Sequence, residues 1–297
     1  MSEAYFEAWR GGVVDTMIGV PASHEQRSAD YYQKMNAGIL DKEAKEKFKF
    51  PAEYMFKDVP DHGDVEEPVE FLLAEMDRFN ISVGMLNVST NPVARQAVKD
   101  HPDRFVASFN VDPNEGMEAV RKLETAVDQF GVRSAQCFPA GLLPQVPIND
   151  KKLYPLYAKC VELDIPMFIN AGVPGPRVPM DCQNVAYLDE VCWFFPELKL
   201  VMRHGAEPWT QLAMKLMLKW PNLYYSTSAF APKHYPEDIL YYANTRGAEK
   251  FVYGGYFPMG LSLERIFSEM PDVDLRDHVW PKFLRENAAR LLKIDLT

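Results

Sequence analysis

The chain has 297 residues, a length that suits one large α/β domain as well as two smaller ones. About 47% of the residues are hydrophobic and 25% are charged, an ordinary balance for a globular protein with a sizeable core. The formal net charge of −10 argues against nucleic-acid and anionic-membrane partners, which demand clustered Lys and Arg. No apolar run approaches the roughly 20 residues that span a bilayer, and the start MSEAYFEAWR lacks signal-peptide features. We therefore expect a cytoplasmic protein.

Eight short apolar or β-branched runs, each ending in turn-forming or polar residues, are predicted strands. In chain order they are residues 12–19, 81–89, 104–112, 133–141, 166–172, 198–205, 223–230 and 250–258. Four cysteines are scattered among these elements without CxxC spacing or nearby histidine pairs, which predicts buried thiols rather than ligands or disulfides. They are Cys137, Cys160, Cys182 and Cys192.

Segments with helical spacing separate the strands. They are residues 66–80, 116–131, 148–165, 187–198 and 207–221. The first places Val69, Leu72 and Met76 on one face, and the second stops at Gly131, a suitable C-terminal glycine. The last has Pro208 near its predicted first turn, where a missing N–H costs nothing.

Apolar strands that alternate with amphipathic helices indicate a parallel sheet covered by helices. Eight such units predict a single (β/α)8 barrel over residues 1–297. The alternative is an open doubly wound sheet, but no glycine-rich phosphate loop follows the first strand. Residues 20–65 form a long insertion between strands one and two. We expect it over the C-terminal mouth of the barrel, either as a lid or as an interface.

In a barrel of this kind the chemistry lies at the carboxyl ends of the strands. The polar or otherwise informative residues at these ends are Asp15, Met17, Gly19, Asn170, Arg203, His204, Ser226, Thr227, Ser228 and Tyr256, with Glu207 just past strand six. No G-x-S-x-G elbow and no nucleotide fingerprint accompanies them.

The order of these segments resembles the amidohydrolase-related family, the second amidohydrolase branch. Its members include decarboxylases of aromatic and α,β-unsaturated acids and some hydrolases. The likeness is carried by EFLLAEMDRFNIS, HPDRFVASFNVDP, IPMFINAG, PELKLVMRHGAEPW, WPNLYYSTSA, EKFVYGGYFP and ENAARLLKID. It covers nearly every predicted element, which supports the barrel.

The resemblance also implies a divalent metal site, and here the chain departs from the family pattern. The family's first strand usually ends in an acidic residue followed by His-x-His, or in a Glu-x-His variant, where this chain has Met17 and Gly19. The family's histidine of strand five corresponds to Asn170, and its aspartate of strand eight corresponds to Tyr256. Only the histidine of strand six remains, as His204.

We therefore expect no metal at the family position. A catalytic zinc site takes about three ligands from His, Asp, Glu or Cys, whereas glycine offers none and a thioether prefers soft ions. Asp15 with His204 would make a two-ligand site. A rearranged site for Zn, Mn or Fe stays as the alternative, and His24 and Glu25 are then the best additional donors.

The remaining candidates each have a structural reading beside the functional one. We assign His204 and Asp15 as candidate catalytic groups, although His204 can instead bond a core carbonyl and Asp15 can be held by Arg203 or a backbone N–H. The candidates for substrate binding are Asn170, Tyr256, Glu207 and Arg203. Glu207 also reads as a first-turn helix acid. Arg133 and Arg177 are further single candidates for a carboxylate clamp. The contexts of His62, His101, His234 and His278 are typical of surface positions.

Two functions remain open. In the first, the protein is an amidohydrolase-superfamily enzyme that binds a small carboxylate-type molecule and acts by hydrolysis or decarboxylation. In the second, it is a non-catalytic paralogue that forms a homo- or hetero-oligomer with a related, metal-bearing barrel, including an oxygenase-type complex. Whether the chain turns over a substrate is not decided by its sequence.

Overall fold

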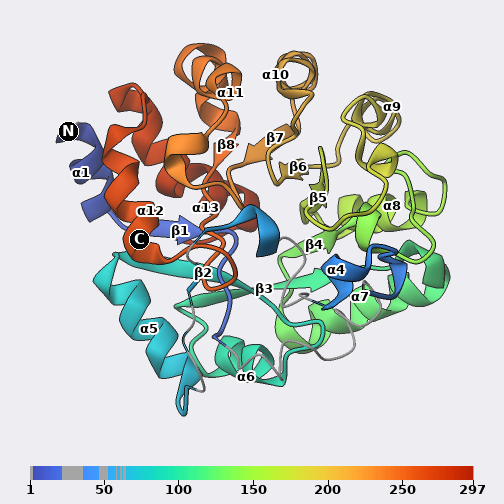
Figure 1. The fold of residues 1–297 in the computed structure, drawn as a ribbon, viewed down its shortest axis with the longest axis horizontal. Coiled ribbons are helices and arrows are strands. Elements are labelled where there is room, and N and C mark those ends of the chain that lie inside the picture. The colour runs from blue at the N-terminus through green and yellow to red at the C-terminus, as the bar shows by residue number, and fades with distance from the viewer. Residues whose placement is uncertain are drawn as a thin grey trace.

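The computed structural model describes residues 3–21, 36–46, 53–57, 59–60, 62 and 65–296. Eight parallel strands form one sheet in the order β1 to β8, curled as a (β/α)8 barrel (Figure 1). Each strand lies inside its predicted run, so the predicted fold is confirmed. The strands are β1 (Val13–Asp15), β2 (Ile81–Asn87), β3 (Phe105–Asn110), β4 (Ser134–Cys137), β5 (Met167–Asn170), β6 (Leu200–Arg203), β7 (Leu223–Ser226) and β8 (Phe251–Val252).

The barrel closes between its last and first strands, just beyond their named ends. Ile18 and Phe257 form a parallel β-bridge, and the hydroxyl of Thr16 donates to the carbonyl of Tyr253 over 2.6 Å. The backbone N–H of Thr16 donates to the same carbonyl at 3.2 Å. These contacts place the ends of β1 and β8 side by side at the mouth.

Helices surround the sheet. They are α1 (Glu3–Arg10), α4 (Lys42–Glu46), α5 (Pro68–Arg78), α6 (Pro92–Asp100), α7 (Met117–Phe130), α8 (Tyr154–Glu162), α9 (Tyr187–Phe194), α10 (Thr210–Lys219), α11 (Glu237–Tyr242), α12 (Leu263–Glu269) and α13 (Asn287–Leu292). Among the described helices, none combines the length and apolarity that a bilayer crossing demands. The four cysteines are free and buried, as predicted.

Helix ends follow their local signals, with one correction. α7 ends where predicted, because Gly131 takes the left-handed conformation at φ 61° and donates to the carbonyl of Val127. α10 begins only at Thr210, so Pro208 precedes the first turn instead of lying in it. The reason is a turn at residues 206–209, in which the N–H of Trp209 donates to the carbonyl of Ala206.

The alternation of side chains along each strand produces two apolar layers. One layer fills the barrel interior and consists of Val14, Val83, Met85, Val106, Phe168, Val201, Tyr224 and Val252, closed below by Ala288, Leu291 and Leu292 of α13. The larger layer lies between the strands and the surrounding helices. Together they fix which side chains of each strand point into the barrel.

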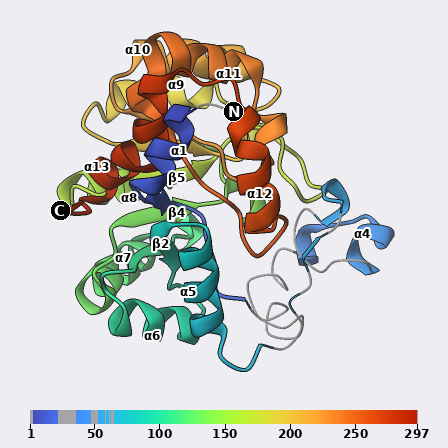
Figure 2. The same ribbon diagram turned by 90° about the vertical axis from the view of Figure 1, so that its left-hand side faces the viewer.

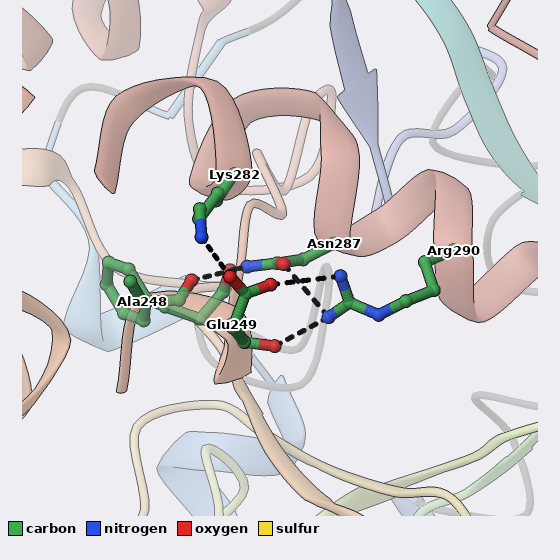
Figure 3. A network of polar contacts seen from close by, with 6 residues as sticks. Ala248, Glu249, Lys282, Asn287 and Arg290 are labelled. Atoms are coloured by element: carbon green, nitrogen blue, oxygen red, sulfur yellow. Dashed lines mark hydrogen bonds and ion pairs between the residues drawn. The ribbon is translucent and has the colours of Figure 1, made fainter. Parts of the chain in front are cut away.

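The floor of the barrel is fastened by a polar network around α13 (Figure 3). The buried amide of Asn287 donates to the carbonyls of Ala248 and Phe251 at 2.7 and 2.8 Å, and its oxygen accepts from Arg290 at 3.0 Å. Glu249 pairs with both Lys282 and Arg290. This network joins α13 to the start of β8, at the end opposite the mouth.

The described part of the insertion lies over the mouth, as predicted. α4 is at the opposite end of the barrel from α13 (Figure 2). The hydroxyl of Tyr54 donates to the carbonyl of Gly175 at 2.7 Å, and Asp41 pairs with Arg177 at 2.8 Å. Both contacts attach the insertion to the loop after β5. Its role as lid or interface stays a prediction.

Candidate ligand-binding site at the barrel mouth

A ring of polar side chains lies directly above the apolar interior. It arises because residues two positions beyond an inward apolar residue point inward again. The ring consists of Thr16, Asn87, Ser108, Gln136, Asn170, Arg203 and Ser226, with Gly254 at the eighth strand. Among these eight described positions Arg203 is the only charged residue, so the ring itself is polar and contains one cation.

A cavity of about 1780 Å³ opens above this ring. Its wall includes Met17, Gly19, Asn170, His204 and Tyr256. The five positions that the family resemblance relates to metal ligands therefore face one space. Arg203 also lines this space, and Glu207, which is exposed, lies on its wall.

Arg203 and Asn170 form a buried pair across neighbouring strands. Their Cα atoms are register partners on β6 and β5, and each residue is only 5% exposed. Nε and Nη2 of Arg203 donate to Oδ1 of Asn170 over 3.1 and 2.8 Å. The amide of Asn170 therefore orients the guanidinium without contributing a negative charge.

His204 follows Arg203 with a left-handed backbone, at φ 64°. Its Nδ1 lies 3.4 Å from the carbonyl oxygen and 3.2 Å from the hydroxyl of Ser228, while its ring meets that of Tyr256 edge-on with centroids 5.5 Å apart. Burial, with the nearby charge of Arg203, lowers the pKa of the imidazole to about 3, although the contact with Ser228 acts the other way. His204 is therefore neutral near pH 7, contacts the carbonyl of Ser228 and lines the cavity, while its catalytic role stays a prediction.

The loops after β1 and β8 are hydrogen-bonded to each other at Met17, Gly19 and Tyr256. The N–H of Tyr256 donates to the carbonyl of Met17 at 2.8 Å, and the N–H of Gly19 donates to the carbonyl of Phe257 at 2.8 Å. A Cβ added at Gly19 would lie 3.3 Å from the ring of Pro258. A side chain at position 19 would therefore fit only if the loop after β8 shifted slightly away from it.

Asp15 is the candidate that the structure does not bring into the cavity. It follows the inward Val14, so it points away from the barrel interior, and it is completely buried. Its Oδ1 accepts from the N–H groups of Met17 and Gly255, both at 2.8 Å, which is one of the two pairings expected for it. Burial raises its pKa to about 6 despite these two bonds.

Sequence reasoning missed a group of amides on the opposite side of the ring. Nδ2 of Asn87 lies 2.9 Å from Oδ1 of Asn110 and 3.3 Å from Oε1 of Gln136. All three residues line the cavity. The signal was available, because Asn87 is two residues beyond the inward Met85, and counting in twos along each strand finds the others.

Several other candidates have structural roles. Arg133 donates to the carbonyls of Leu292 and Lys293 below the barrel, and Arg177 pairs with Asp41 of the insertion. His62 packs against the rings of Phe71 and Phe257 and is partly buried, contrary to its predicted surface position. The reason is that the rings of Phe71 and Phe257 contact it at steep angles, with centroids 5.3 and 5.2 Å away, where the insertion rejoins the barrel.

The exposed His234 lies at the cavity rim, whereas His24 and Glu25 are outside the described residues. Among the residues that the structure describes, no three or more His, Cys, Asp or Glu side chains group closely enough to hold a metal ion. At the other positions that the family resemblance relates to metal ligands, the wall has the amide of Asn170, the thioether of Met17, the phenol of Tyr256 and no side chain at Gly19. These described donors do not fit a divalent transition metal, which takes about three imidazole, carboxylate or thiolate ligands.

The structure is a (β/α)8 barrel with a polar cavity at the carboxyl ends of its strands. The family model described as Amidohydrolase matches residues 44–294, and the chain belongs to that family. The match begins after β1, so Asp15, Met17 and Gly19 lie before the matched region. No curated protein sequence matches the chain significantly.

Solved structures share the fold at low identity. An uncharacterized TIM-barrel protein from Bordetella bronchiseptica is 22% identical with a TM-score of 0.70, covering 95% of this chain and 98% of its own. A 5-carboxyvanillate decarboxylase from Novosphingobium aromaticivorans, with bound manganese and a nitrobenzoic acid, is 16% identical with a TM-score of 0.65 and coverages of 95% and 97%. A 4-oxalomesaconate hydratase from Rhodopseudomonas palustris is 15% identical with a TM-score of 0.59 and coverages of 95% and 95%. At these identities the similarity shows the fold alone.

Proposed function

We propose that this chain binds a small carboxylate-bearing molecule at the barrel mouth and converts it by decarboxylation or hydrolysis without a divalent metal at the family position. One observation supports the proposal most. Met17, Gly19, Asn170 and Tyr256, which the family resemblance relates to metal ligands, line the same cavity as His204.

The composition of the cavity wall supports a carboxylate ligand. Arg203 supplies a cation with planar N–H donors, and the amides of Asn87 and Gln136 supply neutral hydrogen-bonding groups. Phe56, Phe138 and Phe230 add apolar surface. Two structural neighbours were solved with aromatic acids, the 5-carboxyvanillate decarboxylase above and a 2,6-dihydroxybenzoate decarboxylase complexed with 2,6-dihydroxybenzoate. An aromatic acid matches this mixture of cations, amides and aromatic walls.

Of the two reactions, decarboxylation is the better supported. Hydrolysis needs an activated water, and an imidazole with a pKa of about 3 is a poor general base for that step. Decarboxylation breaks the bond between the carboxyl carbon and the substrate, and CO₂ leaves. The bonding electrons stay on the substrate carbon, which then takes a proton from water. His204 can hydrogen-bond the substrate during this step without changing its own charge.

Carbon dioxide release tests this function directly. The purified chain is treated with a chelator, incubated with a panel of hydroxylated benzoates, and monitored for ¹³CO₂ from carboxyl-labelled substrate. We expect release that the chelator does not abolish. Release that requires added Zn²⁺ or Mn²⁺ would overturn the metal-independent part of the proposal. Binding without any release would favour the second candidate below.

The second candidate function is that of a partner subunit for a related barrel. It is favoured by large exposed apolar side chains on three neighbouring outer helices, Trp193 and Phe194 on α9, Leu218 on α10 and Tyr241 on α11. Trp193 is 69% exposed and Tyr241 is 67% exposed, and such apolar surface is typical of contact sites. Light scattering on the isolated chain, and metal analysis of any homologue that co-purifies with it, distinguish a self-sufficient barrel from a partner subunit.

A further inference from the structure

We propose that the side-chain amides of Asn110 and Gln136 form a donor pair that binds the carboxylate of the ligand, and that Asn87 is the positioning residue that turns both amides toward the cavity. All three residues line the cavity. The inference rests on the proposed function, because it assigns residues to the ligand of that same site. It concerns binding alone, so it can be tested without turnover.

The orientation of the Asn87 amide is fixed by the backbone beside it. The N–H of Ser89 lies 3.0 Å from one end of this amide, and a backbone N–H can only donate, so that end is Oδ1. The other end is therefore Nδ2, which donates. Ser89 is itself held in place, because its hydroxyl oxygen accepts from the N–H of Asn110 over 2.6 Å. The local backbone thus determines which way the amide of Asn87 faces.

The amide of Asn87 in turn orients those of Asn110 and Gln136. Its Nδ2 donates to Oδ1 of Asn110 at 2.9 Å and to Oε1 of Gln136 at 3.3 Å. Both oxygens are therefore turned toward Asn87, and both NH₂ groups are turned away from it. Neither NH₂ group has an acceptor among the described residues, and neither is enclosed by protein, so both open into the cavity.

The two NH₂ groups come from neighbouring strands at the same level of the barrel. Asn110 ends β3, Gln136 lies in β4, and their Cα atoms are register partners. Gln136 is only 7% exposed, so its side chain has little freedom to move. Groups placed on strands are held more precisely than groups on loops. The mouth therefore contains a preorganised pair of hydrogen-bond donors.

A carboxylate fits this donor pair better than a hydroxyl or an amide does. Each NH₂ group has two N–H donors, and an ionised carboxylate offers about four lone-pair sites and no proton. Hydrogen bonds to an ionised acceptor are about twice as strong as those between neutral groups. A hydroxyl brings one oxygen with a proton of its own, and an amide would turn an NH₂ group toward one of the donors. The pair therefore favours an acceptor with two adjacent oxygens.

Isothermal titration calorimetry on the full chain tests the inference with benzoate and benzamide, which have nearly equal shapes but differ in their acceptor. Asn110→Leu and Gln136→Met each remove one NH₂ group without changing the charge of the wall, and Asn87→Leu removes the positioning amide. Asn149→Leu is the matched control, because the amide of Asn149 donates to Glu190 outside the cavity. Circular dichroism and melting curves confirm that each variant is folded.

We expect Asn110→Leu and Gln136→Met each to weaken benzoate binding by roughly 5- to 20-fold and benzamide binding by less than about threefold. Asn87→Leu should weaken benzoate binding by about 3- to 10-fold, yet add nothing to the double variant Asn110→Leu/Gln136→Met, because it acts through those two amides. Asn149→Leu should bind as the wild type does. In ¹⁵N spectra, the NH₂ signals that disappear in the two donor variants should shift when benzoate is added to the wild type.

The contrary outcomes are distinct. If the wild type binds benzoate, both donor variants bind it equally well and the NH₂ signals do not move, the inference fails while the proposed function stands. If the donor variants lose benzamide as strongly as benzoate, the amides shape the wall without selecting a carboxylate, and the inference fails as well. If Asn87→Leu weakens binding further in the double variant, Asn87 contacts the ligand itself and is not a positioning residue. If the wild type binds neither benzoate nor any other small carboxylate, the proposed function fails together with the inference.

Discussion

The carboxylate of Asp15 joins the first strand of the barrel to the loop after the last one, since its Oδ1 accepts from the N–H of Gly255 at 2.8 Å across 240 residues of sequence. The other oxygen, Oδ2, is buried and has no hydrogen-bond partner among the described residues. A Cβ added at Gly255 would lie 2.5 Å from Oδ2, so this contact requires a glycine. The two N–H groups that Asp15 accepts from belong to Met17 and to Gly255, the neighbour of Tyr256. Asp15 therefore holds the two loops of the mouth in place from outside the cavity.

The first prediction concerns Asp15 and pH. Its pKa rises from an ordinary 3.8 to about 6 in the fold, so between these values the folded chain binds more protons than the unfolded chain. The stability that this proton supplies is complete below pH 3.8 and is lost as the pH rises through 6. Asp15→Asn, which keeps an acceptor without charge, should raise the free energy of unfolding at pH 7 by up to about 3 kcal/mol and leave it unchanged near pH 3.5.

Urea denaturation of the wild type and of Asp15→Asn at the two pH values measures this difference. If Asp15→Asn were less stable than the wild type by the same amount at both pH values, the charge of the buried carboxylate would be fully compensated by its surroundings in the fold. The same pair of proteins should bind benzoate equally, because Asp15 does not line the cavity.

The second prediction concerns His204. Because its pKa is about 3, the imidazole stays neutral from pH 5 to pH 8, and benzoate affinity should be constant over that range. His204→Ala should weaken binding about 5- to 20-fold through a lost hydrogen bond and a gap beside Tyr256. A titration series by calorimetry checks both. Affinity that rises on acidification through pH 6.5 would mean that the imidazole titrates normally, and unchanged affinity in the variant would make His204 purely structural.

The third prediction concerns the floor of the barrel. Asn287→Ala leaves the carbonyls of Ala248 and Phe251 without their donor in a buried position, which should cost about 2–4 kcal/mol of unfolding free energy. Asn222→Ala is the matched control, because it removes a single exposed bond to the carbonyl of Pro196 and should cost under about 1 kcal/mol. Denaturant midpoints report both. Similar costs for the two variants would contradict a fastening role for the network.

The fourth prediction introduces the donors that the family resemblance implies. Met17→His and Asn170→His together with the native His204 supply three imidazoles around one cavity, and adding Arg203→Ala removes the guanidinium next to His204 in the chain. We expect this triple variant to bind Zn²⁺ near-stoichiometrically, and the two histidine substitutions alone to bind it at least tenfold more weakly. Equilibrium dialysis measures the occupancy. Equal zinc affinity with and without Arg203 would show that its charge does not oppose the ion.

The sequence predicts the barrel well because its signals are local and repeated. Each strand is a short apolar run, and Gly131 ends α7 through a backbone conformation that glycine adopts without strain. The helix α6 was missed although Pro92 at its first position and Asn91 at its cap mark its start, with Asn91 Oδ1 accepting from Val93 and Ala94.

The site is predicted only in part, because its geometry depends on contacts between distant segments. Counting in twos from Val14 would have placed Asp15 outside the cavity and Thr16 within it. No local pattern, however, reveals that Asn170 faces Arg203, since this follows from the register of β5 against β6. The stacking of Phe56 on Tyr256, with centroids 5.6 Å apart, likewise joins the insertion to the β8 loop and has no sequence signal.

Elemental analysis by mass spectrometry, on untagged protein purified from its native host, tests the central claim most directly. The account predicts that zinc, manganese and iron are each far below one ion per chain, and that His204→Ala does not change their content. Near-stoichiometric metal that disappears in His204→Ala would contradict it. That result would establish a rearranged centre at the mouth, with His24 and Glu25 as the next donors to test.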